Sequence, residues 1–166
     1  MLTGRPGCGK TTLVKRVINE LSLPAGGFYT EEMRKAGTRV GFKLVTLDGE
    51  EAAFAHVNFK TGERLGKYGL NLSTLEAVGV KAIREAACTQ QLVVIDEIGP
   101  MELRSGIFRD AVNEALDSGA PTLATIVARL LPFTDAIKKR ADLTVIEVRP
   151  DNREQLVSEL SEQFIA

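Results

Sequence analysis

The 166-residue sequence predicts an α/β protein with a doubly wound, mainly parallel sheet, and we expect residues 1–166 to form one domain. Strand-like apolar runs alternate with helical patterns through the second half of the chain, and this alternation is typical of parallel sheets covered by helices on both faces. One of the runs, Leu-Val-Val-Ile at 92–95, is wholly apolar and mostly β-branched. Such a run indicates a strand that is buried on both faces.

The N-terminal half combines a short first strand, a helix and an antiparallel extension. Only Met1, Leu2 and Thr3 precede a glycine-rich loop, so either the sequence begins part-way through this strand or the strand is shorter than the usual length of about five residues. Apolar residues recur at helical spacing over 11–21 and predict a helix. Residues 27–72 contain strand-like runs separated by Lys-Ala-Gly and Asp-Gly-Glu, which predict a hairpin extension within the same domain.

The second half continues with helices and strands in turn. Ser-Thr-Leu-Glu at 73–76 has the pattern of a capping box and predicts a helix from Ser73 to about Cys88. An apolar stripe over 107–116 predicts the next helix, with Gly119 placed to end it. The segments 122–127 and 143–148 are expected to be strands, and the last helix should begin near Asp151.

Composition narrows the classes of function. The 21 basic and 22 acidic residues give a formal net charge of −1, which argues against nucleic-acid binding driven by counterion release but leaves a local basic patch open. No apolar run approaches the roughly 20 residues of a membrane-spanning helix, and the N-terminus lacks a secretory pattern. Cys8 and Cys88 have neither a disulfide framework nor metal-ligand spacing. We therefore expect a cytoplasmic protein without a membrane partner.

The glycine-rich loop matches the phosphate-loop pattern G-x-x-x-x-G-K-[ST] at every position. Glycines let backbone amides turn toward a β-phosphate, and the N-terminus of the following helix faces the anion. Lys10 would add a mobile charge for the β- and γ-oxygens in a catalytic role, and the Thr11 hydroxyl would ligate Mg²⁺. The predicted nucleotide-binding residues here are Gly4, Arg5, Pro6, Gly7, Cys8, Gly9, Lys10, Thr11 and Thr12.

A second acidic site follows the apolar run at 92–95. Asp96 and Glu97 come directly after this strand, at the carboxyl edge where open α/β sheets bind ligands. Asp96 is placed to hold the Mg²⁺ shell, and Glu97 to orient and deprotonate water near the γ-phosphate. An Asp-Glu pair on its own would more simply open a solvated loop, but the phosphate loop in the same chain favours the functional interpretation.

The segments TGRPGCGKTTL, GGFYTEEMR, GFKLVTLDG, KYGLNL, VVIDEIGPMEL and PDNRE occur in this order. Their order resembles the small P-loop nucleoside triphosphatases of archaea and thermophilic bacteria, a family related to the human cancer-related nucleoside triphosphatase. The resemblance runs from residue 2 to the C-terminal helix. It implies a RecA-like P-loop fold with an additional strand, Mg²⁺, and slow hydrolysis of ATP, GTP, CTP and UTP to the diphosphates. It places the catalytic carboxylate on Glu97, and nucleotide-binding segments on residues 4–11 and about 93–100, which include Ile98 and Gly99.

Five further residues have both a functional and a structural interpretation. Thr125 could sense the γ-phosphate or hold the attacking water, or it could simply fill a strand position. Arg64 and Lys67 could place positive charge over the γ-phosphate, or belong to a solvated loop. Asn152 and Arg153 could contact the base, or only lie at a helix start.

Two alternatives to a triphosphatase stay open. A small-molecule or nucleoside kinase could hold its acceptor under residues 128–140, whose cations would act as a lid: Arg129, Lys138, Lys139 and Arg140. A nucleotide-gated switch could instead use the hairpin region to meet a protein partner. Glu97 directly after Asp96 favours water as the nucleophile. The sequence leaves open the preferred base, the partner, the oligomeric state, the pathway, and whether an arginine finger acts in cis or in trans.

Overall fold

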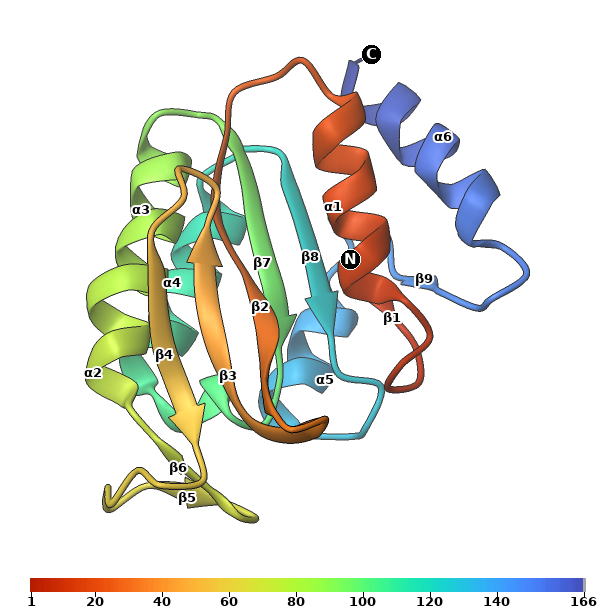
Figure 1. Cartoon of the computed structure of the whole chain (residues 1–166). Coiled ribbons are helices and arrows are strands. Elements are labelled where there is room, and N and C mark those ends of the chain that lie inside the picture. Colours follow the sequence, from red (N-terminus) through yellow and green to blue (C-terminus); the bar gives the residue numbers. More distant parts are fainter. Residues whose placement is uncertain (166) are drawn as a thin grey trace.

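A mixed sheet organises the computed structural model, which describes residues 1–165. Over these residues the sheet has nine strands in the order β5-β6-β4-β3-β2-β7-β8-β1-β9 (Figure 1). The strands are β1 (Leu2–Thr3), β2 (Ala25–Lys35), β3 (Thr38–Thr46), β4 (Glu51–His56), β5 (Arg64–Leu65), β6 (Tyr68–Leu70), β7 (Leu92–Ile98), β8 (Thr122–Ile126) and β9 (Ile146–Glu147).

The helices are α1 (Lys10–Glu20), α2 (Leu72–Thr74), α3 (Lys81–Cys88), α4 (Gly106–Asp117), α5 (Pro132–Lys138) and α6 (Arg153–Ile165). A π-helical turn, Leu75–Val80, joins α2 to α3, and a 3₁₀ turn, Glu102–Arg104, precedes α4. None of the described helices combines the length and the apolar character that crossing a membrane requires.

The sheet is parallel on one side and antiparallel on the other. β2, β7, β8, β1 and β9 run parallel, whereas β3, β4, β6 and β5 extend the sheet as antiparallel strands beyond β2. β8 lies between β1 and β7, so one strand separates the phosphate-loop strand from the strand that holds Asp96 and Glu97. This arrangement confirms the predicted additional-strand fold with a hairpin extension.

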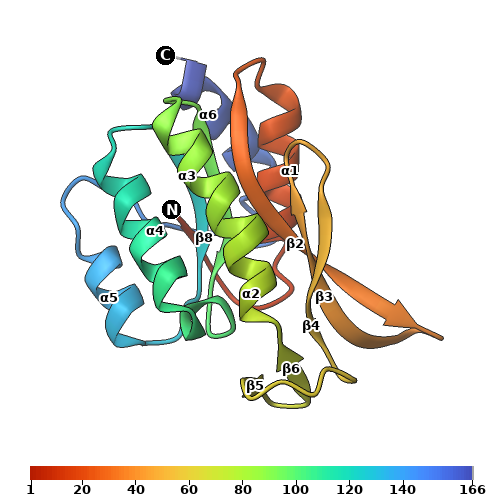
Figure 2. The ribbon, with the colours of Figure 1, turned by 90° about the vertical axis from the view of Figure 1, so that its left-hand side faces the viewer.

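Helices cover both faces of the parallel part (Figures 1 and 2). On one face of the sheet, Val93 and Ile95 of β7 pack in the same core as α3 and α4. On the other face, Val94 packs with α1 and α6. The alternation explains the wholly apolar run, because each residue of a doubly covered strand meets a hydrophobic layer. On the first face, the rings of Phe28 and Phe108 meet edge to face with centroids 6.3 Å apart. These two layers fix the position of the carboxyl end of β7.

Most predicted elements are confirmed, with differences at their ends. Gly119 follows α4 with φ +78°, the left-handed conformation that ends a helix. The strand expected at 92–95 continues through Asp96 and Glu97 to Ile98. The strand expected at 143–148 is formed only by residues 146–147, and the last helix starts at Arg153. The helix α5 was not predicted, because its seven residues are too few to show a clear period.

The predicted capping box is wrong. Asn71 rather than Ser73 caps the helix, since its side-chain oxygen accepts a hydrogen bond of 3.1 Å from the Thr74 amide. The Glu76 carboxylate instead accepts a hydrogen bond of 2.6 Å from the Ser105 hydroxyl. Ser105 in turn caps α4, so Glu76 serves a contact between two helices. Asn71 therefore takes the capping role predicted for Ser73, and Glu76 bonds to the distant Ser105 and not to the start of its own helix.

Candidate functional site

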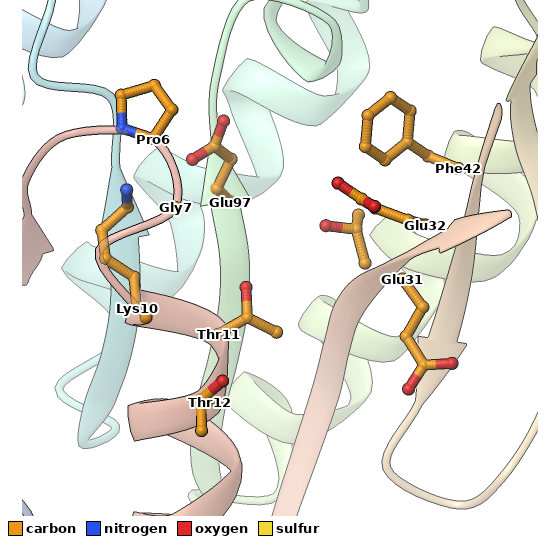
Figure 3. A pocket seen from close by; sticks show the side chains of 11 residues that line it. Pro6, Gly7, Lys10, Thr11, Thr12, Glu31, Glu32, Phe42 and Glu97 are labelled. Atoms are coloured by element: carbon orange, nitrogen blue, oxygen red, sulfur yellow. The ribbon is translucent and has the colours of Figure 1, made fainter. Parts of the chain in front are cut away.

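A cavity of about 590 Å³ opens beside the phosphate loop. Its first wall is the loop with the start of α1 and Glu97, and its second wall comes from β2 and β3, with Glu32 and Phe42 across from the loop (Figure 3). The lining residues are Pro6, Gly7, Gly9, Lys10, Thr11, Thr12, Thr30, Glu31, Glu32, Phe42 and Glu97. The size suits a nucleotide-sized ligand, because small-molecule sites span roughly 300–1,000 Å³.

The phosphate loop ends where α1 begins. Gly9 is the N-cap of α1 with φ +96°, a conformation that residues with a Cβ rarely adopt. Leu13, Val14 and Val17 are buried and hold α1 against the sheet. No side chain in the described chain caps this helix, and its first turn has no acidic residue. The first amides of α1 are therefore available to an anion in the cavity.

The Lys10 side chain lies back over the phosphate loop. Its Nζ donates hydrogen bonds to the carbonyl oxygens of Gly4, at 3.0 Å, and Arg5, at 3.3 Å. Both contacts are to neutral acceptors, which bind an ammonium group less strongly than phosphate oxygens do. A phosphate in the loop can therefore draw this cation away from the carbonyls without breaking an ion pair.

Asp96 joins three parts of the site. One carboxylate oxygen accepts a hydrogen bond of 2.7 Å from the Thr11 hydroxyl of α1, and the other accepts one of 2.5 Å from the Thr125 hydroxyl of β8. The side chain is only 2% exposed. Burial raises the pKa of Asp96, while the two hydroxyl contacts and the charge of Lys10 act in the opposite direction. The predicted residues Thr11, Asp96 and Thr125 thus meet at one point.

This group fits a hard divalent cation. A hydroxyl and a carboxylate supply only oxygen donors, and Mg²⁺ prefers one or two carboxylates completed by substrate phosphates and waters. The described residues contain no cluster of three or more His, Cys, Asp or Glu that could hold a metal alone. A cation held by Thr11 and Asp96 would therefore need the phosphate oxygens of the ligand, and P-loop triphosphatases bind their metal in this way.

Glu97 lies beside the phosphate loop and lines the cavity (Figure 3). The peptide bond between Asp96 and Glu97 is cis. Burial raises the pKa of Glu97, the neighbouring Asp96 carboxylate raises it further, and the charge of Lys10 lowers it. A methyl group on Gly99 would lie 2.5 Å from Glu97 Oε1, so the carboxylate is packed directly over this glycine. A carboxylate with a raised pKa in a ligand-sized cavity can serve as a general base.

A second buried carboxyl group, Glu102, was missed by the sequence analysis. It is 5% exposed, and burial together with the charge of Glu97 raises its pKa to about 8. Glu97 and Glu102 both line a smaller cavity of about 170 Å³, which shares Thr30 and Phe42 with the larger one. Met101 and Leu103 flank Glu102 in the sequence, and these apolar neighbours were the available signal that it is buried.

Two residues of the expected segment 93–100 differ in their environment. Gly99 supports Glu97, as described above. The Ile98 side chain is fully buried in the hydrophobic core, because β7 continues to this residue and turns it toward the α3–α4 face. Ile98, which the resemblance places in a nucleotide-binding segment, therefore presents no side chain to the large cavity.

Arg64 and Lys67 do not line the cavity. The Arg64 guanidinium donates to the carbonyl oxygens of Phe59 and Lys67, at 3.0 and 2.9 Å, and Lys67 Nζ donates to that of Arg39 at 3.2 Å. These exposed contacts close the β5–β6 turn and tie it to Phe59 and to β3. The structure therefore does not bring these two cations to the phosphate loop.

Asn152 and Arg153 lie on the other side of the loop. The Asn152 side chain accepts from the Arg149 amide at 2.8 Å and donates to the Glu147 carbonyl at 2.9 Å, so it shapes the segment before α6. The Arg153 side chain packs against Gly9, where an added Cβ would lie 2.4 Å from its Nη1. Arg5 and Cys8 line a separate cavity on this side.

Comparisons with known proteins show which family the chain resembles. A family model described as NTPase matches residues 1–161. The nucleoside-triphosphatase THEP1 of Thermotoga sp. strain RQ2 is 46% identical over 160 residues, covering 96% of this chain and 91% of the relative. The nucleoside-triphosphatase THEP1 of Methanocaldococcus jannaschii is 38% identical over 170 residues, covering 99% of this chain and 96% of the relative.

Two solved structures share the fold. The crystal structure of THEP1 from Aquifex aeolicus superposes with a TM-score of 0.86 at 34% identity, over 96% of this chain and 94% of that one. The solution structure of a human cancer-related nucleoside triphosphatase superposes with a TM-score of 0.83 at 35% identity, over 98% of this chain and 95% of that one. The resemblance noted in the sequence is thereby confirmed, and the chain belongs to the NTPase family.

Proposed function

We propose that the protein hydrolyses nucleoside triphosphates to the diphosphate and phosphate with Mg²⁺, and that it accepts ATP, GTP, CTP and UTP alike. The observation that supports this most directly is the place of Glu97: a carboxylate in the same cavity as Lys10 and Thr11, next to the Asp96 metal site. The relatives named nucleoside-triphosphatase support the reaction class.

Substrate binding follows from the loop. The amides of the loop and of the first turn of α1 bind the β-phosphate, and Lys10 exchanges its two carbonyl contacts for β- and γ-oxygens. Thr11 and Asp96 would hold Mg²⁺, which would neutralise charge on the phosphate oxygens. Thr125 keeps the Asp96 carboxylate oriented through its hydrogen bond.

Glu97 acts on the nucleophile. Its carboxylate accepts a proton from a water molecule as the water oxygen bonds to the γ-phosphorus and the bond to the β–γ bridging oxygen breaks. The proton on Glu97 then passes to the released phosphate or to solvent. A general base is most effective when its pKa lies near the working pH, and burial moves Glu97 in that direction.

The contacts of residues 128–140 weigh against the kinase alternative. Lys138 Nζ donates to the Val127 carbonyl at 2.7 Å, and Arg140 forms ion pairs with Asp117 and Asp142. Two of the four lid cations are thus occupied by contacts within the chain, and none of the four lines the large cavity. The switch alternative has one supporting observation, because the β2–β3 hairpin is a wall of the cavity and a partner bound there would adjoin the nucleotide.

The test measures phosphate release from each of the four nucleotides without any acceptor, in the parent and in Glu97→Gln. The variant keeps the side-chain size but removes the proton acceptor, so we expect kcat to fall by at least about a hundredfold. The Kd for the Mg²⁺-nucleotide should stay within a few-fold, and Glu162→Gln on the exposed face of α6 serves as the control. Parent-like hydrolysis by Glu97→Gln would contradict the role of Glu97. Release that requires an acceptor would favour a kinase.

A further inference from the structure

The small cavity of about 170 Å³ joins Glu97 to a second buried carboxyl group, that of Glu102. Thr30, Phe42 and Glu97 line both this cavity and the large one, so Glu97 faces both spaces. Apart from Thr30 and the two glutamates, the lining of the small cavity is apolar: Phe42, Leu65, Pro100 and Met101. Hydrolysis as proposed above uses Glu97 and leaves Glu102 without a role.

Gly99 lies against both carboxyl groups. An added methyl group on Gly99 would lie 2.5 Å from Glu97 Oε1. Burial has the largest effect on the pKa of Glu102 and raises it, while the backbone amide of Gly99 acts in the opposite direction, as an amide beside a carboxyl group does. The Leu103 amide donates a hydrogen bond of 3.0 Å to the Gly99 carbonyl oxygen and closes this turn. The chain that follows β7 therefore brings Glu102 close to Glu97.

Packing alone does not explain a carboxyl group at residue 102. Glu102 is 5% exposed, and an apolar side chain of similar length would fill the same place without the free-energy cost of burying a polar group. The charged neighbours that raise its pKa are Glu97 and Asp96, both negative, and the residues that β2, β3 and β5 contribute to the small cavity carry no charge. Glu102 therefore keeps its proton at neutral pH, and a protonated carboxyl group is a hydrogen-bond donor.

We propose that Glu102 is a positioning residue for Glu97: its neutral carboxyl group donates a hydrogen bond to the Glu97 carboxylate, directly or through a water molecule in the small cavity. The inference rests on the proposed function, in which Glu97 is the general base. A donor on one oxygen of Glu97 fixes the rotation of the carboxylate and leaves the other oxygen to accept from the attacking water. The small cavity has room for water, since one molecule occupies about 30 Å³. A carboxylic acid that its apolar surroundings keep neutral can serve as such a donor.

Two substitutions of Glu102 separate its hydrogen bond from its size. Glu102→Gln keeps the shape and an N–H donor but does not titrate, whereas Glu102→Met keeps an unbranched side chain and has no donor. We expect Glu102→Met to lower kcat by at least about tenfold, because Glu97 is no longer held in place, and Glu102→Gln to stay within about threefold of the parent at pH 7. The Kd of Mg²⁺-ADP, measured by calorimetry, should be unchanged in both variants, since Glu102 does not line the large cavity.

The pH dependence of kcat is a measurement that a role in packing alone would not change. The pKa of Glu102 is about 8, so the parent loses the donor as the pH rises through this value, whereas Glu102→Gln keeps it. The kcat of Glu102→Gln divided by that of the parent should therefore rise about fivefold between pH 7 and pH 9. For Glu162→Gln, at an exposed position of α6, the same ratio should stay constant. Circular dichroism at both pH values checks that each protein is folded.

A double variant tests whether Glu102 acts through Glu97. In a protein that already carries Glu97→Gln, Glu102→Met should lower kcat by less than about twofold, because the group that Glu102 positions is gone. A full tenfold loss in that background, or a kcat ratio for Glu102→Gln that is the same at pH 7 and pH 9, would overturn the positioning role and leave the hydrolysis intact. If Glu102→Met does not fold, the pH dependence of Glu102→Gln decides. Parent-like hydrolysis by Glu97→Gln would overturn both proposals.

Discussion

Replacing Glu102 by glutamine should stabilise the protein at alkaline pH. Glu102 is buried beside Glu97, and its pKa is raised from 4.5 to about 8. Between these two values the folded protein keeps a proton that the unfolded chain releases. The contribution of this carboxyl group to stability is therefore complete below pH 4.5, decreases as the pH rises, and reaches its lowest value above about pH 8.

The size of the effect follows from the two pKa values. Each pKa unit corresponds to about 1.36 kcal/mol, so the difference between 4.5 and about 8 corresponds to about 5 kcal/mol at most. This is a large part of the about 5–15 kcal/mol that stabilises a typical protein. Glutamine has nearly the same shape and no titration, so the variant should lack this pH dependence.

The assay is urea denaturation at pH 5 and pH 9 in EDTA and without nucleotide, so that neither metal nor ligand changes the result. The free energy of unfolding of Glu102→Gln minus that of the parent should rise by several kcal/mol between the two pH values. Glu162→Gln, at an exposed position of α6, should show almost no such rise. If the free energy of unfolding of Glu102→Gln differs from that of the parent by the same amount at both pH values, the claim that Glu102 is buried and protonated is refuted.

Three further changes test the site. Lys10→Ala should remove two charge-assisted hydrogen bonds to phosphate of about 1.5–3 kcal/mol each, so the Kd for triphosphate should rise by at least about a hundredfold. The melting temperature should not change. An unchanged Kd in calorimetry would contradict the assignment of the phosphate loop as the triphosphate site. Asp96→Asn should raise the Mg²⁺ concentration for half-maximal activity by about 10–100-fold, measured by metal titration, and an unaltered titration curve would remove Asp96 from the metal site. Gly99→Ala should displace Glu97 and lower kcat by roughly a hundredfold while circular dichroism stays the same, and a parent-like kcat would show that the packing is not needed.

Local patterns predicted the phosphate loop, the central strand and the two carboxylates at its end. Gly9, Lys10 and Thr11 owe their place to a turn that their own sequence forms, and Asp96 follows a short β-branched apolar run that is typical of a buried strand. The proximity of Thr11, Asp96 and Thr125 follows from the expected strand order alone. Such features depend on residues close in sequence or on one topological rule.

The remaining parts of the site depend on contacts between distant segments. Phe42 and Glu32 form a cavity wall because the long β2–β3 hairpin lies across the cavity from the phosphate loop, and no pattern within the hairpin predicts that position (Figure 3). Glu102 is buried and lines a cavity with Thr30 and Phe42, which are distant from it in the sequence. Glu76 likewise serves Ser105, 29 residues away. The ends of several helices and strands were predicted wrongly for the same reason, because tertiary contacts outweigh local conformational preference.

The narrow edge of the sheet gives the nucleotide a role in the fold itself. β1 and β9 contribute two residues each, joined through the Ile146 amide to the Met1 carbonyl and the Val148 amide to that of Thr3. Strands with so few cross-strand bonds open locally at lower free energy than a long central strand such as β7. A nucleotide bound in the phosphate loop, whose Gly4 lies against the Val148 carbonyl just beyond β9, would stabilise this edge as its concentration rises above Kd. In native-state hydrogen exchange, amide protection at this edge would therefore follow nucleotide occupancy, while that of β7 would report global unfolding.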